Sequence, residues 1–188
     1  MKSNGNKNSK INLIYIFAIG CLIGWIGEEI AIYFMFDKLV KRGTFYGPIC
    51  SIYGFSAIIL YFLFLKTPKT KSNIFRIFII SSLALGGFEL ISGLFFKYVF
   101  NIEIWNYKGN YLSILDYTTV PMVIFWGVLG SIYVYFIQQH LLKLIDLISQ
   151  KYKYVIIYVF VILYLIDFVF STYNVFTNPE VLYNLVNI

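Results

Sequence analysis

Charged residues are scarce in this sequence of 188 residues. Lys, Arg, Asp and Glu make up 13% of it, whereas they make up about a quarter of an average soluble domain. Hydrophobic residues account for 60% and aromatic residues for 21%, and the mean hydropathy is +0.76. The formal net charge of +6 in so apolar a chain is typical of loops beside anionic lipid. The composition therefore predicts a membrane protein and excludes a soluble domain and a nucleic-acid-binding protein.

Cysteine and histidine are nearly absent. Cys21 and Cys50 are the two cysteines, and His140 is the one histidine. Two cysteines define no disulfide framework, and we expect two free, buried thiols. A single histidine with no second histidine and no suitably spaced carboxylate cluster provides no metal site. The sequence therefore predicts neither a metal nor a cofactor, and it favours an interfacial position for His140.

Common catalytic motifs are missing as well. The sequence has no GxxxxGK[ST] phosphate-binding loop, no GxSxG, no HExxH and no CxxC. We therefore expect that the chain hydrolyses no nucleotide itself and that it is not an enzyme. A membrane-embedded enzyme with a carboxylate base is the weakest hypothesis, because no nucleophile or metal set accompanies the acidic residues.

Five apolar runs occupy most of the chain, and each is close to the length of about 20 residues that crosses a bilayer. They predict an all-α integral membrane bundle of five transmembrane helices, at residues 11–36, 48–65, 73–100, 119–148 and 154–176. Residues 1–10 are polar and lack apolar periodicity, so we expect a disordered cytoplasmic tail. Residues 11–176 form the predicted transmembrane domain, and residues 177–188 form a short extracytoplasmic tail.

The segment between the first two apolar runs, residues 42–54, is rich in glycine. Its sequence is RGTFYGPICSIYG. Gly43 and Gly47 permit a tight backbone, and Pro48 suits the first turn of a following helix. We interpret the segment as a hairpin that re-enters the bundle and covers a polar pocket. A plain turn between two helices is the alternative.

Lysine and arginine are distributed unevenly between the two predicted sides of the bundle. Ten of the 15 fall on the side of the N-terminal tail, within residues 2–10, 66–76 and 143–153, and five fall on the other side. Because cytoplasmic loops carry the excess of these residues, we expect a cytoplasmic N-terminus and an external C-terminus. The loop of residues 101–118, which contains Trp105, then faces outward with the glycine-rich segment.

Three carboxylates lie inside apolar runs. Glu28 is eight residues before Phe36, Glu89 is eight before Lys97 and Asp167 is nine before Phe176. At 1.5 Å per residue, each lies roughly 12–14 Å below the outer edge. An acidic residue inside a span is costly and usually faces a cavity or a partner. We expect the three to line one outward-facing pocket. The alternative is that each acid pairs separately with nearby hydroxyl groups.

The remaining residues of the predicted solute-binding site come from the two outer loops and from the start of the second helix. We expect the glycine-rich hairpin and the loop around Trp105 to close the pocket from outside. The side chains expected there are Arg42, Tyr46, Cys50, Tyr53 and Trp105.

Several short motifs follow one another along residues 24–171. They are Gly24-Trp25 with Glu28, the block RGTFYGPICSIYG at 42–54, Glu89, Trp105-Asn106-Tyr107, Trp126-Gly127 with Gly130, and Asp167 with Ser171. In this order they resemble the ABC-transporter permease family of the CmpB type, whose members are small bacterial membrane proteins. The resemblance implies a multi-pass fold, the bacterial cell membrane and a transport role. The chain departs from the family pattern at Lys41, Ser51, Lys97 and Asn106.

The residues and the resemblance together predict a transporter permease subunit. It would bind a small polar or cationic solute in the outward-facing acidic pocket and would depend on a separate nucleotide-binding ATPase subunit. Five helices are few for a complete transport path, so we expect a homodimer surrounded by membrane lipid, with no nucleic-acid partner. The alternative is a non-transporting membrane sensor or assembly protein in which the intramembrane carboxylates are structural.

Overall fold

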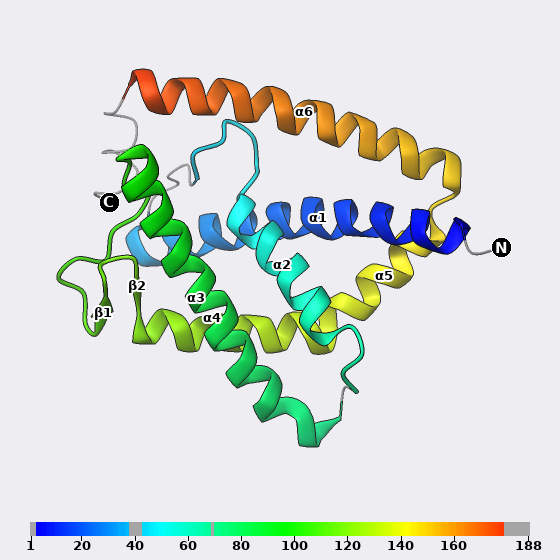
Figure 1. Cartoon of the computed structure of the whole chain (residues 1–188), viewed down its shortest axis with the longest axis horizontal. Helices are drawn as coiled ribbons and strands as arrows, with labels where there is room; N and C mark the ends of the chain where they lie inside the picture. The colour runs from blue at the N-terminus through cyan, green and yellow to red at the C-terminus, as the bar shows by residue number, and fades with distance from the viewer. Residues whose placement is uncertain (1–2, 38–42, 69, 179–188) are drawn as a thin grey trace. The chain divides into compact units, whose positions relative to one another are not determined.

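The computed structural model describes residues 3–37, 43–68 and 70–178 (Figure 1). The chain divides into two compact units. Unit 1 contains the described residues up to Ile58 together with those from His140 onward, and unit 2 contains Ile59–Gln139. Arg42 lies outside the described residues.

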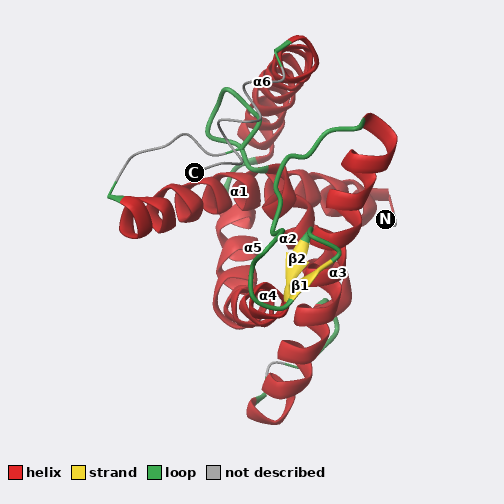
Figure 2. Ribbon diagram, turned by 90° about the vertical axis from the view of Figure 1, so that its left-hand side faces the viewer, coloured by secondary structure: helices red, strands yellow, loops and turns green. Residues whose placement is uncertain are grey.

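Helices make up most of the described chain (Figure 2). The first three α-helices are α1 (Ser3–Phe36), α2 (Ser51–Phe64) and α3 (Ile74–Phe100), with a short 3-10 turn η1 (Lys71–Asn73) before α3. The next long helix has three parts, α4 (Val120–Ile132), the π-helical η2 (Tyr133–Ile137) and α5 (Gln138–Leu147), and α6 spans Gln150–Thr177. The predicted all-α membrane bundle is confirmed.

Within the described residues, four helices are long and apolar enough to cross a membrane. They are Ile11–Phe34 within α1, Ile74–Phe100, Val120–Leu147 and Gln150–Thr177. The predicted boundaries lie within four residues of the observed ones, except that α1 begins at Ser3 instead of Ile11. α2 has 14 residues, which is shorter than the 17–25 residues that usually span a bilayer.

A short antiparallel pair of strands interrupts the predicted loop between α3 and α4. Strand β1 (Ser113–Ile114) pairs with β2 (Thr118–Thr119), with Ser113 opposite Thr119. The chain leaves α3 through Asn101, whose φ of 55° is left-handed, a conformation that asparagine tolerates better than most residues. It enters α4 through Thr119, whose hydroxyl accepts a hydrogen bond of 3.1 Å from the amide of Met122. Pro121 stands in the first turn of α4, where a missing N–H costs nothing.

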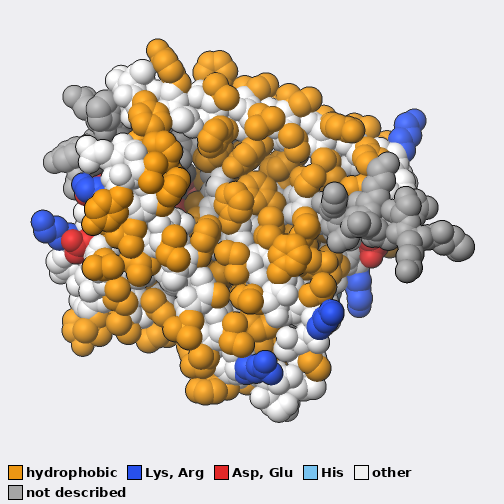
Figure 3. All heavy atoms as spheres, viewed as in Figure 1, with side chains coloured by type: hydrophobic (Ala, Val, Ile, Leu, Met, Phe, Trp, Pro, Cys, Tyr) orange, Lys and Arg blue, Asp and Glu red, His pale blue; other side chains and the backbone are white. Residues whose placement is uncertain are grey.

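Large apolar side chains point outward from the helices. Phe34 is 82% exposed and Tyr98 is 81% exposed. In Figure 3, hydrophobic side chains cover the helices of the viewed face, whereas Lys, Arg, Asp and Glu lie near its margins. Contiguous exposed apolar surface is a liability in water but is what a bilayer core requires. The exposure pattern therefore agrees with the membrane location.

Aromatic rings hold the elements of unit 1 together. Phe17 of α1 meets Phe55 of α2 edge-on at 4.9 Å between ring centroids, and it meets Tyr164 of α6 at 5.4 Å. Tyr164 also lies 5.3 Å from Phe45, which precedes α2. Edge-to-face and tilted pairs at these distances are favourable for aromatic rings. Tyr164 therefore connects α6 to α1 and to the segment before α2.

Close helix packing organises unit 2. A Cβ on Gly86 of α3 would lie 2.7 Å from Val123 of α4, and a Cβ on Gly93 would lie 2.6 Å from the ring of Tyr117. Small residues at such positions let a second helix approach closely. The glycines of α3 thus accommodate α4 at one level and the loop that precedes α4 at another.

Candidate functional site

Asp167 of α6 binds the backbone of the glycine-rich segment. The amide of Tyr46 donates to Asp167 Oδ1 at 2.8 Å, and the amide of Gly47 donates to Oδ2 at 2.7 Å. The hydroxyl of Ser171, one helical turn further along α6, also donates to Oδ1, at 2.7 Å. Hydrogen bonds to a charged carboxylate are stronger than neutral ones. Asp167 therefore fixes this stretch of backbone on α6.

Position 47 favours glycine because the Asp167 carboxylate occupies the space that a side chain would need. A Cβ at this position would lie 2.9 Å from Asp167 Oδ2, closer than a methyl group can approach without movement. Gly43, which begins the described part of the segment, has a φ of +80°, a conformation that glycine adopts without steric cost. Gly47 therefore permits the close contact with Asp167, whereas Gly43 permits a backbone conformation that changes the direction of the chain.

Side chains of α6 also contact residues on both sides of Tyr46 and Gly47. Phe45 packs on Tyr164 and Phe168, whose ring centroids lie 5.3 Å and 6.2 Å from its own. The hydroxyl groups of Ser51 and Tyr164 are 3.2 Å apart. Tyr164 lies three residues before Asp167 and four residues before Phe168, so it shares a side of α6 with each of them. The segment is thus held by a carboxylate at its centre and by rings and a hydroxyl at its sides.

The other predicted residues of unit 1 lie along α1. Cys50 is buried, and its amide donates to the carbonyl of Cys21 at 3.2 Å. The ring of Tyr53 lies directly against Gly24. Glu28 is half-buried, one turn beyond Gly24, and the Tyr46 side chain is exposed. Unit 1 therefore brings Tyr46 together with Asp167, and Cys50 and Tyr53 together with α1.

Glu89 is the buried carboxylate of unit 2. It is 4% exposed, in the middle of α3. The hydroxyl of Thr118 donates to Glu89 Oε2 at 2.6 Å, and the hydroxyl of Tyr107 donates to Oε1 at 3.2 Å. Both donors belong to the segment between α3 and α4. Glu89 therefore binds the outer loop of unit 2, much as Asp167 binds the glycine-rich segment of unit 1.

Trp105 belongs to the same loop. Its indole Nε1–H donates to the carbonyl of Tyr117 at 2.9 Å, and the side chain is half-buried. This bond joins the first part of the loop to the turn between β1 and β2. Trp105 therefore stabilises the loop that carries Tyr107 and Thr118 to Glu89.

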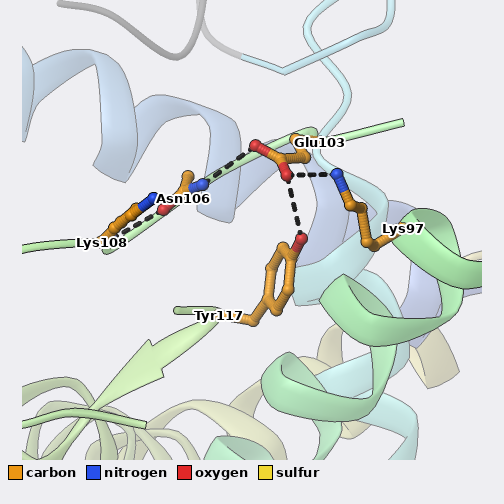
Figure 4. Close-up of polar contacts among 5 residues, drawn as sticks. All are labelled: Lys97, Glu103, Asn106, Lys108 and Tyr117. Carbon is orange, nitrogen blue, oxygen red and sulfur yellow. Dashed lines mark hydrogen bonds and ion pairs between the residues drawn. The ribbon is translucent and has the colours of Figure 1, made fainter. Parts of the chain in front are cut away.

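Glu103 is the centre of a polar cluster beside this loop (Figure 4). Lys97 Nζ lies 2.6 Å from Glu103 Oε1, and the amide nitrogen of Asn106 donates to Oε2 at 2.9 Å. The hydroxyl of Tyr117 points at the same carboxylate, 3.4 Å from Oε1. The hydrogen bond from Lys97, followed by that from Asn106, lowers the pKa of Glu103 below its usual range. Burial raises the pKa of the Tyr117 hydroxyl, which keeps it a neutral donor.

Sequence reasoning missed three residues of these two networks. Glu103 and Tyr107 lie within the loop that is predicted to face outward. Tyr107 also belongs to the motif Trp105-Asn106-Tyr107, which is a sequence signal for it. Thr118 ends the loop without any motif. The predicted common pocket, which would take acidic residues from both units, stays a prediction.

Comparison with known proteins gives one family match. The model of a family described as "Putative ABC-transporter type IV" (ABC_trans_CmpB) matches residues 15–172. No curated protein and no solved structure matches the chain. The matched range includes the glycine-rich segment, Glu28, Glu89 and Asp167.

Proposed function

Since the chain belongs to the family described as "Putative ABC-transporter type IV", we propose that it is the membrane-spanning subunit of an ABC-type transporter for a small polar or cationic solute. A separate nucleotide-binding subunit supplies ATP hydrolysis in this proposal. The four apolar helices of spanning length are consistent with a subunit that lies mostly within the membrane.

The buried carboxylate of Glu89 carries the proposal for the solute class. It lies within a spanning helix at 4% exposure, where a charged residue costs about 2.5–3.5 kcal/mol on insertion scales. The hydroxyl groups of Thr118 and Tyr107 donate hydrogen bonds to this carboxylate and orient it. A carboxylate kept in a membrane at this cost is typical of a pathway for a cation or a polar solute.

The proposed binding site combines this carboxylate with the other acidic residues and with the outer loops. It consists of Glu28, Arg42, Tyr46, Cys50, Tyr53, Glu89, Trp105 and Asp167. Each of the two loops in the proposed site is hydrogen-bonded to an acidic residue of its own unit, the glycine-rich segment to Asp167 and the loop around Trp105 to Glu89. The excess of Lys and Arg on one side supports a cytoplasmic N-terminus in a bacterial cell membrane.

Isolation of the chain from its native membrane tests the proposal. A tagged chain, purified in mild detergent, should retain a nucleotide-binding protein that hydrolyses ATP. Transport of a cationic solute in membrane vesicles should require ATP and should fall at least tenfold in Glu89→Gln, with Glu29→Gln as the control. A purified chain without any ATPase partner, together with transport that is unaffected in Glu89→Gln, would contradict the proposal.

A non-transporting sensor or assembly protein is the second candidate. One observation favours it, because both Asp167 and Glu89 hydrogen-bond to loops of the chain itself, which is what structural carboxylates do. The double variant Glu28→Gln/Glu89→Gln discriminates between the two functions. The cellular activity of a sensor would survive these substitutions, whereas that of a cation transporter would not.

A further inference from the structure

Two segments of the sequence match at a fixed distance without a gap. Residues 15–36, in α1, align with residues 76–97, in α3, at a shift of 61. Seven of the 22 aligned pairs are identical. The identical pairs are Ile16 and Ile77, Phe17 and Phe78, Ile19 and Ile80, Leu22 and Leu83, Glu28 and Glu89, Ile30 and Ile91, and Phe34 and Phe95. The match includes a charged residue, which apolar composition alone does not explain.

The helices that follow α1 and α3 match each other at a second shift, of 73 residues. Pro48 corresponds to Pro121, and Gly54 corresponds to Gly127. An aromatic residue precedes the glycine in both cases, as Tyr53-Gly54 and as Trp126-Gly127. The two shifts differ by 12 residues, so the second loop is longer by 12. The longer loop is the one that contains β1 and β2.

In the first pair of helices, α1 and α2 approach each other closely at Gly54 and Gly20. A Cβ on Gly54 of α2 would lie 2.5 Å from the sulfur of Cys21 and 2.8 Å from the ring of Phe17, both on α1. One turn along each helix, a Cβ on Gly20 would lie 3.0 Å from the Cβ of Ala57. All five residues belong to unit 1.

The second pair of helices repeats these contacts at the equivalent positions. A Cβ on Gly127 of α4 would overlap the hydroxyl of Ser82 and would lie 2.8 Å from the ring of Phe78, both on α3. One turn along, a Cβ on Gly130 would lie 2.5 Å from the Cβ of Ser81. At the shift of 61, Cys21 corresponds to Ser82 and Phe17 corresponds to Phe78. At the shift of 73, Gly54 corresponds to Gly127. The two pairs therefore pack in the same register.

The equivalent contacts in the two helix pairs are an observation separate from the sequence identity between α1 and α3. Identical residues in two helices do not by themselves require that each helix meets its neighbour at the same position along its length. Each pair uses a phenylalanine and a small residue on the first helix against a glycine on the second. The buried position before this phenylalanine is isoleucine in both, and Ile16 and Ile77 are each 0% exposed. Agreement between sequence and contacts indicates one structural unit that occurs twice.

We propose that residues 15–57 and 76–130 are two copies of one helix–loop–helix unit, and that Glu28 and Glu89 are its equivalent acidic positions with a shared role in binding a cationic solute. This inference rests on the proposed function for the solute. In this proposal each copy crosses the membrane twice, so the two copies insert in the same orientation, as the parallel repeats of some transporters do. Glu29 corresponds to Leu90, so it has no acidic equivalent.

Four alanine variants test the repeated packing. Gly54→Ala and Gly127→Ala should lower the apparent melting temperature of the purified chain in detergent by similar amounts, because each methyl group meets the same kind of contacts. Gly27→Ala and Gly87→Ala are the matched controls, since a Cβ at either position meets nothing within 4 Å. They should leave the melting temperature unchanged or raise it slightly, because alanine favours helix over glycine. A loss in only one of Gly54→Ala and Gly127→Ala would overturn the repeat.

Cation-induced stabilisation tests the shared role without any need for transport. A ligand that binds the folded protein raises its melting temperature, so choline, tetramethylammonium and putrescine are each compared with sodium chloride at equal ionic strength. At least one of them should stabilise the wild type, and both Glu28→Gln and Glu89→Gln should abolish that shift, while Glu29→Gln retains it. No shift with any of the three in the wild type, or a loss in only one of the two variants, would overturn the shared role.

The proposed transport function can fail separately from this inference. A chain that copurifies with no ATPase but loses cation stabilisation in both glutamine variants would keep the equivalence of Glu28 and Glu89 and reject the transporter. ATP-dependent transport that depends on Glu89 alone would keep the transporter and reject the equivalence.

Discussion

Gly47 and Asp167 form a close contact in which the backbone amide of Gly47 binds the Asp167 carboxylate. Asp167 accepts two backbone amides and the hydroxyl of Ser171, and the absence of a side chain on Gly47 allows its carboxylate to approach. A hydrogen bond to a charged group contributes about 1.5–3 kcal/mol, so two such bonds are enough to decide whether the segment stays on α6. The residue that anchors the glycine-rich segment is therefore about 120 positions away from it in the sequence.

Replacement of Asp167 by Asn should release the glycine-rich segment. An amide side chain keeps the size of the carboxylate but presents an NH2 group to one of the backbone amides, so we expect a loss of about 1.5–3 kcal/mol for that contact. In a Cys21→Ser background, the buried thiol of Cys50 should then react faster with a maleimide. Ser171→Ala, which removes a single donor, is the control and should change the rate less. Equal rates in wild type and Asp167→Asn would show that other contacts hold the segment.

Gly47→Ala should produce a similar release by a steric route. The added methyl group would lie 2.9 Å from Asp167 Oδ2, and overpacking of this kind costs about 1–3 kcal/mol. The expected result is a lower melting temperature of the purified chain and faster modification of Cys50. An unchanged melting temperature would mean that the segment can shift without loss of its bonds to α6.

Glu103 should make the outer loop of unit 2 sensitive to acid. Its pKa in the folded chain is lowered by Lys97 and Asn106, compared with about 4.3 in an unstructured peptide. Because this pKa is lower in the folded chain, ionised Glu103 stabilises the loop at any pH above its pKa in the unfolded chain. That stability is lost as the pH falls through its pKa in the folded chain. Fluorescence of Trp105 should therefore change as the pH falls below about 4.3, and the part of that change caused by Glu103 should be absent in Glu103→Gln. An identical acid transition in the variant would assign it to other groups.

Among the elements, α2 is the one whose length does not suit a complete crossing. Its 14 residues rise about 21 Å, compared with a hydrocarbon core of about 30 Å. The segment before α2 binds Asp167, which is ten residues before the end of α6 at Thr177 and hence about 15 Å below that end. Non-helical backbone at membrane depth is tolerated where it is buried in protein. We therefore expect the glycine-rich segment to supply the missing length of the α2 crossing.

Cysteine labelling determines which side of the membrane each loop faces. In a Cys21→Ser/Cys50→Val background, Tyr111→Cys places a thiol at a site that is 78% exposed in the loop before α4. It should react with a membrane-impermeant maleimide in intact cells. Ser72→Cys, in η1, should react only after the membrane is permeabilised. The reverse pattern would place the N-terminus outside.

For the whole molecule, the lipid-facing character of the helices limits what the chain does alone. Exposed apolar side chains such as Phe34 and Tyr98 are suited to contact with lipid or with another chain. The four helices of spanning length are few for a complete transport path. We therefore expect two copies of the chain in the working assembly. Native mass spectrometry of the detergent-solubilised complex should give two copies of this chain together with the nucleotide-binding subunits. A particle with one copy would contradict the homodimer.

The amino-acid sequence by itself determined the membrane class and most helix boundaries of this protein, because long apolar runs cross a bilayer whatever their neighbours are. It also placed Glu89 and Asp167 inside spanning helices, since their positions within those runs are fixed by counting. Tertiary structure alone decided their partners. Asp167 binds backbone amides, which have no residue-specific signal, and Glu89 binds Thr118, which no motif distinguishes. Such contacts join residues far apart in the sequence, so they depend on how the helices pack.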